Sequence, residues 1–284
     1  CNDIKKVVEP TFSKKTGNTI YYVDFSSDDF KLGGSSFAQA LGKIGVETPD
    51  IKDSAKFKAA FNAIQELVIM GLLTAGHDIS AGGLITTLLE MCFADVDLGA
   101  LIDISALGES DSTKVLFAEN AGVVLQGTNT SEIESILSAA GLKFYKIGTA
   151  FEGDTLDIVN GNDNLSLNVE ELRDTWFKTS YLLDQKQSAN ETATERFENY
   201  KEQPLEFDFP EHFTGKLPKI EGKKPIAAVL REKGSNSERE MANALYLAGF
   251  EVRDVHMTDL ISGRETLEDV QFLAAVGGFS NSDV

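Results

Sequence analysis

The sequence has few cysteines, histidines and tryptophans. Its 284 residues include 2 cysteines, 3 histidines and 1 tryptophan. Two thiols, at Cys1 and Cys92, are too few for a disulfide framework, and Cys92 lies in an apolar helical pattern, as a small core residue would. This cysteine usage excludes a disulfide-stapled scaffold and favours a reducing compartment, so we expect a cytoplasmic location.

Basic residues are scarce beside acidic ones. The chain carries 26 Lys and Arg residues against 45 Asp and Glu residues, for a formal net charge of -19. This balance repels nucleic acids and acidic membrane surfaces unless basic residues cluster, and the sequence has no basic cluster. It also has no apolar run of the roughly 18 residues that a membrane span requires. We therefore expect neither a nucleic acid nor a membrane as a partner.

Strand and helix patterns alternate from the start of the chain. Residues 19–27 form a β-branched and aromatic run typical of a buried strand, and the glycines at 33–34 lead into a helix. A second helix is expected to end at Gly71. The apolar residues that recur on one face of this helix are Phe57, Phe61, Ile64 and Val68.

The alternation continues through the middle of the chain. Residues 114–127 predict two short strands broken near Asn120. Ser131 and Glu134 form a capping-box pattern that opens a helix, and residues 144–148 predict another strand. Alternating strands and helices predict the α/β class.

A change of pattern suggests two domains joined by a linker. We expect residues 1–186 to form the first domain and residues 223–284 a second α/β domain. Between them, at 187–222, charges and three prolines interrupt the periodicity, which is typical of an extended linker. The chain begins without a methionine, and we expect it to be a segment of a longer protein whose second domain is truncated.

The second domain is expected to pair strands with one amphipathic helix. A strand follows Pro225, and the run at 271–276 predicts a further strand that leads to two glycines. Between them, residues 237–250 predict a helix. Its inward residues are expected to be Ala242, Leu245 and Ala248.

The stretch GHDISAGGL, residues 76–84, precedes an apolar helix. A helix N-terminus exposes unpaired N–H groups and a positive dipole end, so the turn from Ser80 to Gly83 suits an anionic oxygen. Gly82 and Gly83 allow the backbone to approach a bound phosphate closely. The Asp78 carboxylate would repel a phosphate directly, but it can bind one through a magnesium ion that lies between them. A second interpretation stays open, in which Asp78 or Ser80 only caps the helix.

Neighbouring features favour structural interpretations. His77 is a single histidine beside a core strand, where a hydrogen-bonded structural residue is more typical than a base. In LGGSS, Gly33 and Gly34 repeat the glycine and hydroxyl design at a helix start, and a plain turn is the simpler interpretation. The helix after Gly83 is expected to bury Leu84, Leu88 and Met91 on one face.

Four longer segments carry a family resemblance. They are LGGSSFAQ (32–39), HDISAGGLITTLLEMCFA (77–94), AAVLREKGSNSEREMANALYLAGFEVRDVHMTDLISGR (227–264) and GGFSNSDV (277–284). In this combination and order they resemble the phosphoribosylformylglycinamidine synthase family. The resemblance implies the C-terminal α/β subdomain of an aminoimidazole ribonucleotide synthetase-like domain, a linker, and the truncated start of a class I glutaminase α/β domain.

The resemblance also implies an activity and its partners. Such a ligase uses ATP and glutamine to convert formylglycinamide ribonucleotide to formylglycinamidine ribonucleotide in purine synthesis. Its partners would be these three small molecules and the remaining domains of the same chain. Because the family's glutaminase nucleophile lies beyond the GGFS loop, the chain by itself is expected to be inactive.

Particular residues acquire roles through the resemblance. Asp78 is expected to ligate Mg²⁺ and Ser80 to contact ATP or ADP, with Gly82 and Gly83 in the same nucleotide-binding loop. Ala81 departs from the acidic residue common in the motif. The two glycines of GGFS form the expected glutaminase oxyanion loop, and Asn281-Ser282 replace a frequent Tyr-Gly after it. These two glycines are Gly277 and Gly278.

Two alternatives stay open. The chain could be a non-catalytic module that binds nucleotide and Mg²⁺ for structural purposes. It could also be a relative of the free-standing aminoimidazole ribonucleotide or selenophosphate synthetases, although those lack the second domain that begins at Pro225. The reading frame on either side of the segment would separate the three hypotheses.

Overall fold

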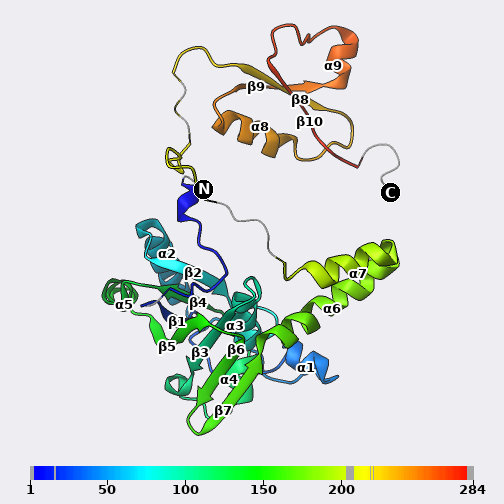
Figure 1. Cartoon of the computed structure of the whole chain (residues 1–284). Coiled ribbons are helices and arrows are strands. Elements are labelled where there is room, and N and C mark those ends of the chain that lie inside the picture. Colours follow the sequence, from blue (N-terminus) through cyan, green and yellow to red (C-terminus); the bar gives the residue numbers. More distant parts are fainter. Residues whose placement is uncertain (1–2, 16, 203–207, 218, 220, 280–284) are drawn as a thin grey trace. The chain divides into compact units, whose positions relative to one another are not determined.

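The computed structural model describes residues 3–15, 17–202, 208–217, 219 and 221–279 (Figure 1). They divide into two compact units: a larger unit, Lys6–Asp208, and a smaller unit that begins at Phe209 and includes residues 3–5. Within the described residues, no helix is long and apolar enough to cross a membrane. The domain bounds expected from the sequence stay a prediction.

The larger unit is built on one seven-stranded sheet. Its strands lie in the order β2-β4-β1-β5-β3-β6-β7, and β3 with β6 is its parallel pair. The other neighbours are antiparallel, so this is a mixed sheet of the predicted α/β class. The strands are β1 (Thr19–Asp24), β2 (Leu73–Asp78), β3 (Leu98–Asp103), β4 (Gly122–Gly127), β5 (Lys143–Glu152), β6 (Thr155–Asn160) and β7 (Asp163–Asn168).

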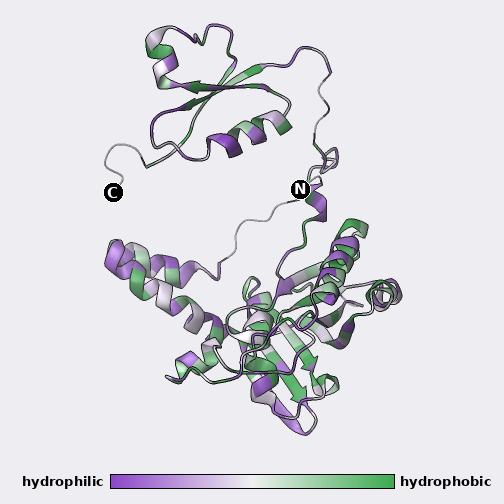
Figure 2. Ribbon diagram, turned by 180° about the vertical axis from the view of Figure 1, so that it is seen from behind, coloured by the Kyte–Doolittle hydropathy of each residue, from purple (hydrophilic) through white to green (hydrophobic). Residues whose placement is uncertain are grey.

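Helices cover both faces of this sheet because alternate residues of a strand point to opposite sides. Tyr21 and Val23 of β1 pack with α2 and α5, whereas Ile20 and Tyr22 pack with α3 and α4. Figure 2 shows many strand residues in the hydrophobic colour, as a doubly covered sheet requires. The helices are α1 (Ser36–Ala40), α2 (Ser54–Met70), α3 (Gly83–Phe93), α4 (Ser112–Phe117), α5 (Thr130–Ala139), α6 (Val169–Gln187) and α7 (Asn190–Asn199), with 3-10 turns η1 (Ile4–Lys6) and η2 (Ser105–Leu107).

Local signals predicted several elements correctly. The strand expected at 19–27 is β1, which pairs with β4 and β5 on its two sides but ends earlier, at Asp24. Helix α2 ends at Gly71, which has the left-handed conformation. Leu84, Leu88 and Met91 are all buried on α3, as their spacing predicted. In α2, Phe57 and Ile64 pack against the core as predicted, whereas Phe61 is 53% exposed. The fully buried residues of this helix are Ala60, Ala63 and Leu67.

Two predictions between residues 112 and 134 are wrong. The first of the two expected strands is helix α4, which Asp111 caps by accepting the N–H groups of Thr113 and Lys114. Helix α5 is capped by Asn129, whose side chain accepts the N–H of Glu132, and not by Ser131. A run of three apolar residues does not distinguish a strand from a short helix, and the cap residue decided both cases.

The range expected to be an extended linker contains helix α7. It packs against α6 through aromatic rings, including Tyr181 stacked on Phe197 with centroids 4.5 Å apart. The expectation of an extended chain is therefore wrong for 190–199. Charged residues on the outer face hid the periodicity of this short helix.

The smaller unit has a parallel three-stranded sheet in the order β10-β8-β9. Leu245 of its helix α8 packs on the sheet, as predicted, but Ala248 is exposed at the helix C-cap. Ala248 lies beyond the last helical turn and so leaves the inward face. The elements are β8 (Ile226–Arg231), α8 (Glu238–Leu247), β9 (Glu251–His256), α9 (Met257–Ser262) and β10 (Phe272–Ala275).

Candidate functional site

The polar loops of the sequence motifs lie at one end of the strands of the larger sheet, which we call the sheet edge. Strands β1 and β2 end there at Asp24 and Asp78, and the antiparallel strand β4 between them begins there at Gly122. The register pairs Asp24 with Gly122 and Asp78 with Val123. The loops after β1 and β2 and the segment before β4 therefore meet at this edge.

The GHDISAGGL motif spans the end of β2 and the start of α3. The Asp78 side chain is 75% exposed, and Ser80 is also exposed. Gly82 is the N-cap with φ 92°, and no side chain of the described residues caps α3. The interpretation in which Asp78 or Ser80 caps this helix is therefore wrong, and both side chains are left at the surface of the loop.

The start of α3 is instead contacted by a carboxylate that the sequence analysis missed. The N–H of Gly82 and the N–H of Ser36 both donate to Oε1 of Glu119, at 2.8 and 2.7 Å. Burial raises the pKa of Glu119, but hydrogen bonds from the N–H groups of Gly82 and Ser36 and from the Ser36 side chain outweigh this effect, so the pKa lies below its ordinary value. The signal in the sequence was an acidic residue in the short segment between helix α4 and strand β4.

Packing by itself requires both glycines of the motif. A Cβ on Gly83 would lie 2.7 Å from the carbonyl oxygen of Leu116, and a Cβ on Gly82 would lie 2.2 Å from Oγ1 of Thr86. The Gly83 N–H donates to the carbonyl of Ser80 at 3.0 Å. Both glycine N–H groups are thus engaged within the chain.

His77 has contacts at both ring nitrogens. Nδ1 lies 2.7 Å from the carbonyl oxygen of Asp78, and Nε2 lies 3.4 Å from Oε2 of Glu90. These contacts are those expected of a structural histidine. The imidazole orients the end of β2 against helix α3.

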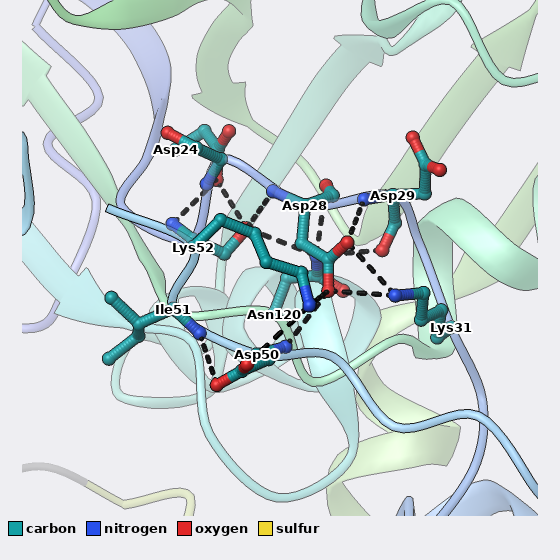
Figure 3. A network of polar contacts seen from close by, with 10 residues as sticks. Asp24, Asp28, Asp29, Lys31, Asp50, Ile51, Lys52 and Asn120 are labelled. Carbon is teal, nitrogen blue, oxygen red and sulfur yellow. Dashed lines mark hydrogen bonds and ion pairs between the residues drawn. The ribbon is translucent and has the colours of Figure 1, made fainter. Parts of the chain in front are cut away.

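Beside this loop, Asp28 is the centre of a network of polar contacts (Figure 3). Lys31 Nζ donates to both of its carboxylate oxygens at 2.9 Å, and Lys52 Nζ lies 3.5 Å from Oδ2. The N–H groups of Asp29 and Asp50 donate to the same carboxylate at 3.0 Å. Asp28 therefore ties the turn after β1 to the loop before α2.

The buried amide of Asn120 also contacts this turn (Figure 3). Its Nδ2 donates to Ser26 Oγ at 3.1 Å, to the carbonyl of Asp29 at 3.2 Å and to that of Asp28 at 3.4 Å. The residue is 1% exposed. Glu119 and Asn120 together connect three loops at the sheet edge through two consecutive residues.

A cleft of about 510 Å³ opens next to the network. Its walls carry more carboxylates than amines, so it suits a cationic or hydroxyl-bearing group better than a free phosphate. Tyr22 and Tyr145, cross-strand partners with ring centroids 6.3 Å apart, line it on the sheet side. Its charged residues are Asp24, Asp28, Asp29, Glu47, Glu109, Lys31, Lys114 and Lys143.

The network predicts an acid-sensitive turn. The hydrogen bond from Lys31 is the main cause that lowers the pKa of Asp28, to about 2. A carboxyl group with a depressed folded-state pKa stabilises the protein above its unfolded pKa, and this stability is lost as pH falls through the folded value. We expect the melting temperature of the protein to fall more steeply toward pH 2.5 than that of Asp28→Asn.

Circular dichroism melts between pH 5 and pH 2.5 measure this difference. Asp97→Asn, a substitution of an exposed aspartate outside the network, should keep the steep dependence of the unsubstituted protein. Parallel pH curves for the protein and Asp28→Asn would contradict the assignment.

The expected oxyanion glycines lie after β10. Gly278 pairs with Ser235 in an isolated bridge, and a Cβ on Gly278 would lie 2.4 Å from the carbonyl oxygen of Gly234. The Gly277 carbonyl accepts the N–H of Asn236 at 2.8 Å. This packing brings the loop after β8 to the end of β10, while Asn281 and Ser282 lie outside the described residues.

Comparison with known proteins places this fold in a class. Residues 15–159, about half of the chain, match the family described as AIR synthase related protein, C-terminal domain, and the chain belongs to that family. Residues 224–284 match the CobB/CobQ-like glutamine amidotransferase domain. Both matches agree with the class that the sequence segments predicted.

More particular relatives match the whole chain. It is 37% identical to a protein of Arabidopsis thaliana named probable phosphoribosylformylglycinamidine synthase, chloroplastic/mitochondrial, and covers 20% of that protein. It is 35% identical to a protein of Caenorhabditis elegans named probable phosphoribosylformylglycinamidine synthase, and covers 23% of it. The predicted resemblance is thereby confirmed, and the chain spans about a fifth of the length of these relatives.

Among solved structures, PurL of Thermotoga maritima complexed with FGAR is similar to this chain. The sequence identity is 20% and the TM-score 0.49, and the alignment covers 60% of this chain and 30% of the other.

Proposed function

We propose that this chain is part of an ATP- and glutamine-dependent ligase that makes formylglycinamidine ribonucleotide from formylglycinamide ribonucleotide. The observation that carries the proposal is 37% and 35% identity over the whole chain to proteins named for this synthase. The joint matches of residues 15–159 and 224–284 favour the ligase over a free-standing nucleotide-binding module. Formylglycinamide ribonucleotide, glutamine, ATP and the other domains of a longer chain are the proposed partners.

Within this proposal, Asp78 and Ser80 form the contacts to Mg²⁺ and to the nucleotide. Both side chains are exposed at the edge of the sheet. Among the described residues no three His, Cys, Asp or Glu side chains group into a metal site. Asp78 is therefore proposed to supply one carboxylate to an ion that the nucleotide also holds. One carboxylate fits Mg²⁺ when phosphate oxygens and waters complete its six ligands, and the ion would offset phosphate charge there.

The role proposed for Gly82 and Gly83 is to form the turn of this loop. Their N–H groups donate to Glu119 and to Ser80, so neither is a free donor for a phosphate. The glycines let the backbone pass close to helix α4 and direct Asp78 and Ser80 outward.

Asp78→Ala tests the site. We expect the affinity of the 284-residue chain for ADP with Mg²⁺ to fall about tenfold, because a charge-assisted contact to the ion is lost. Isothermal titration calorimetry measures this affinity. Glu66→Ala, which removes one exposed carboxylate from helix α2, controls for the change in net charge and should bind as the unsubstituted chain does. Equal affinity of Asp78→Ala and the unsubstituted chain would contradict the assignment.

The chain by itself is proposed to be inactive as a glutaminase. Glutamine hydrolysis requires an exposed, activated thiolate. Cys92 is fully buried on α3, and burial raises the pKa of its thiol to about 12, with Arg173 lowering it in part. Cys1 lies outside the described residues. The cytoplasmic location stays a prediction, since one relative is named for chloroplasts or mitochondria.

A further inference from the structure

One carboxylate oxygen connects two helix starts that are far apart in the sequence. Ser36 is the first residue of α1 and Gly82 the N-cap of α3, and both donate their N–H groups to Oε1 of Glu119. Because ionised acceptors form the stronger hydrogen bonds, this pair resists separation of the two loops.

The surroundings of Glu119 reinforce the same contact. Phe37 of α1 stacks on Phe117 of α4 with ring centroids 4.6 Å apart. Asn120, the next residue, holds the turn after β1. Contacts on both sides thus fix the short segment that carries Glu119. The position of its carboxylate is therefore well defined, and the loops that donate to it are held in place.

The loop from Asp78 to Gly82 has two anchors. At its start, the pairing of β2 with β4 fixes Asp78, and the Ile79 N–H donates to the carbonyl of Gly122 at 2.9 Å. At its end, Gly82 donates to Glu119 at 2.8 Å. Ser80 lies between these anchors, so removal of the second one leaves the C-terminal half of the loop less firmly held, chiefly by the hydrogen bond from the Gly83 N–H to the Ser80 carbonyl at 3.0 Å.

We propose that Glu119 is the positioning residue of the candidate nucleotide site, which orients the loop of Asp78 and Ser80 by holding Gly82 against the start of α1. This role rests on the proposed function of that loop. In this role Glu119 acts through the backbone of Gly82 and not by a contact of its own with the nucleotide. Its carboxylate is an anion of the protein itself that accepts a hydrogen bond at the N-terminus of α3.

Two substitutions in the 284-residue chain test the proposal. Glu119→Ala removes the acceptor and should weaken binding of ADP with Mg²⁺ at least tenfold. Glu119→Gln keeps an acceptor oxygen of the same reach and should recover most of that loss. The control is Asp53→Asn, because the Asp53 carboxylate also accepts two backbone N–H groups, those of Ala55 and Lys56, but at the start of α2.

A second measurement does not depend on nucleotide. Hydrogen exchange followed by NMR should show that the amides of Ser36 and Gly82 lose protection together in Glu119→Ala, and keep it in Asp53→Asn. The positioning role would be overturned if the two amides exchange independently of each other in Glu119→Ala. It would also be overturned if Asp53→Asn and Glu119→Ala lose the same affinity when they have lost the same thermal stability. Failure of the unsubstituted chain to bind ADP with Mg²⁺, with the two amides still coupled, would count against the proposed function of the loop and leave Glu119 as its anchor.

Discussion

Gly83→Ala is expected to lower the free energy of unfolding of the larger unit by about 3 kcal/mol, from left-handed strain and overpacking together. Gly83 has φ 74°, a conformation that costs L-residues energy through their Cβ. Its Cβ would also lie 2.7 Å from the carbonyl oxygen of Leu116 and 2.9 Å from that of Ala118. Neither oxygen belongs to a flexible side chain, so α3 would have to move away from the end of α4.

Gly71→Ala separates the two causes. Gly71 has φ 70° at the C-cap of α2, and a Cβ there would meet nothing within 4 Å. We expect this variant to lose only about 1 kcal/mol, the strain part alone. Urea unfolding measures both values, and a Gly83→Ala variant no less stable than Gly71→Ala would show that α3 and α4 are not packed this closely.

The second large effect is expected for Asn120→Asp. The substitution keeps the shape of the side chain but replaces its NH₂ donor by an oxygen that faces Ser26 Oγ and the carbonyls of Asp28 and Asp29. A buried charge without compensation costs about 3 to 5 kcal/mol. We therefore expect a loss of that size at neutral pH, with the turn after β1 released from the sheet edge.

The pH dependence of the stability of Asn120→Asp shows whether the loss comes from the new charge or from a change of side-chain shape. Burial and the facing oxygens raise the pKa of a carboxyl group placed at this position, so its cost is largest at neutral pH and falls as pH falls toward 5. Asn62→Asp, on the exposed face of α2, should change stability little at either pH. A loss in Asn120→Asp that is the same at pH 7.5 and pH 5 would contradict the electrostatic cause.

Together the two variants concern the sheet edge that carries the candidate site. Gly83 fixes the loop of Asp78 against α4, and Asn120 fixes the turn after β1. In both cases the residue type follows from what surrounds it in the fold. Packing and internal hydrogen bonds therefore hold the loops of the candidate site in place.

The sequence by itself determined the α/β class, the buried strand at 19–24, the inner face of α3 and the family resemblance. The first three depend on the period of apolar residues and on glycine turns, which act between neighbours in the chain. The resemblance rests on the four motif segments at 32–39, 77–94, 227–264 and 277–284. The turn that holds Asp78 and Ser80 could be found in the same way, since it leads into a helix with an apolar face. The roles expected of these two residues come from the resemblance.

Only the tertiary structure decided what these local signals leave open. Helix α4 could not be distinguished from a strand by three apolar residues, and charged residues hid the periodicity of α7. Glu119 could not be connected with Gly82 and Ser36, because the three residues are 37 and 83 positions apart and meet only when β4 lies between β1 and β2. Sequence patterns report the environment of neighbouring residues, whereas a carboxylate that joins two distant loops is specified by strand order and by the packing of the helices on the sheet.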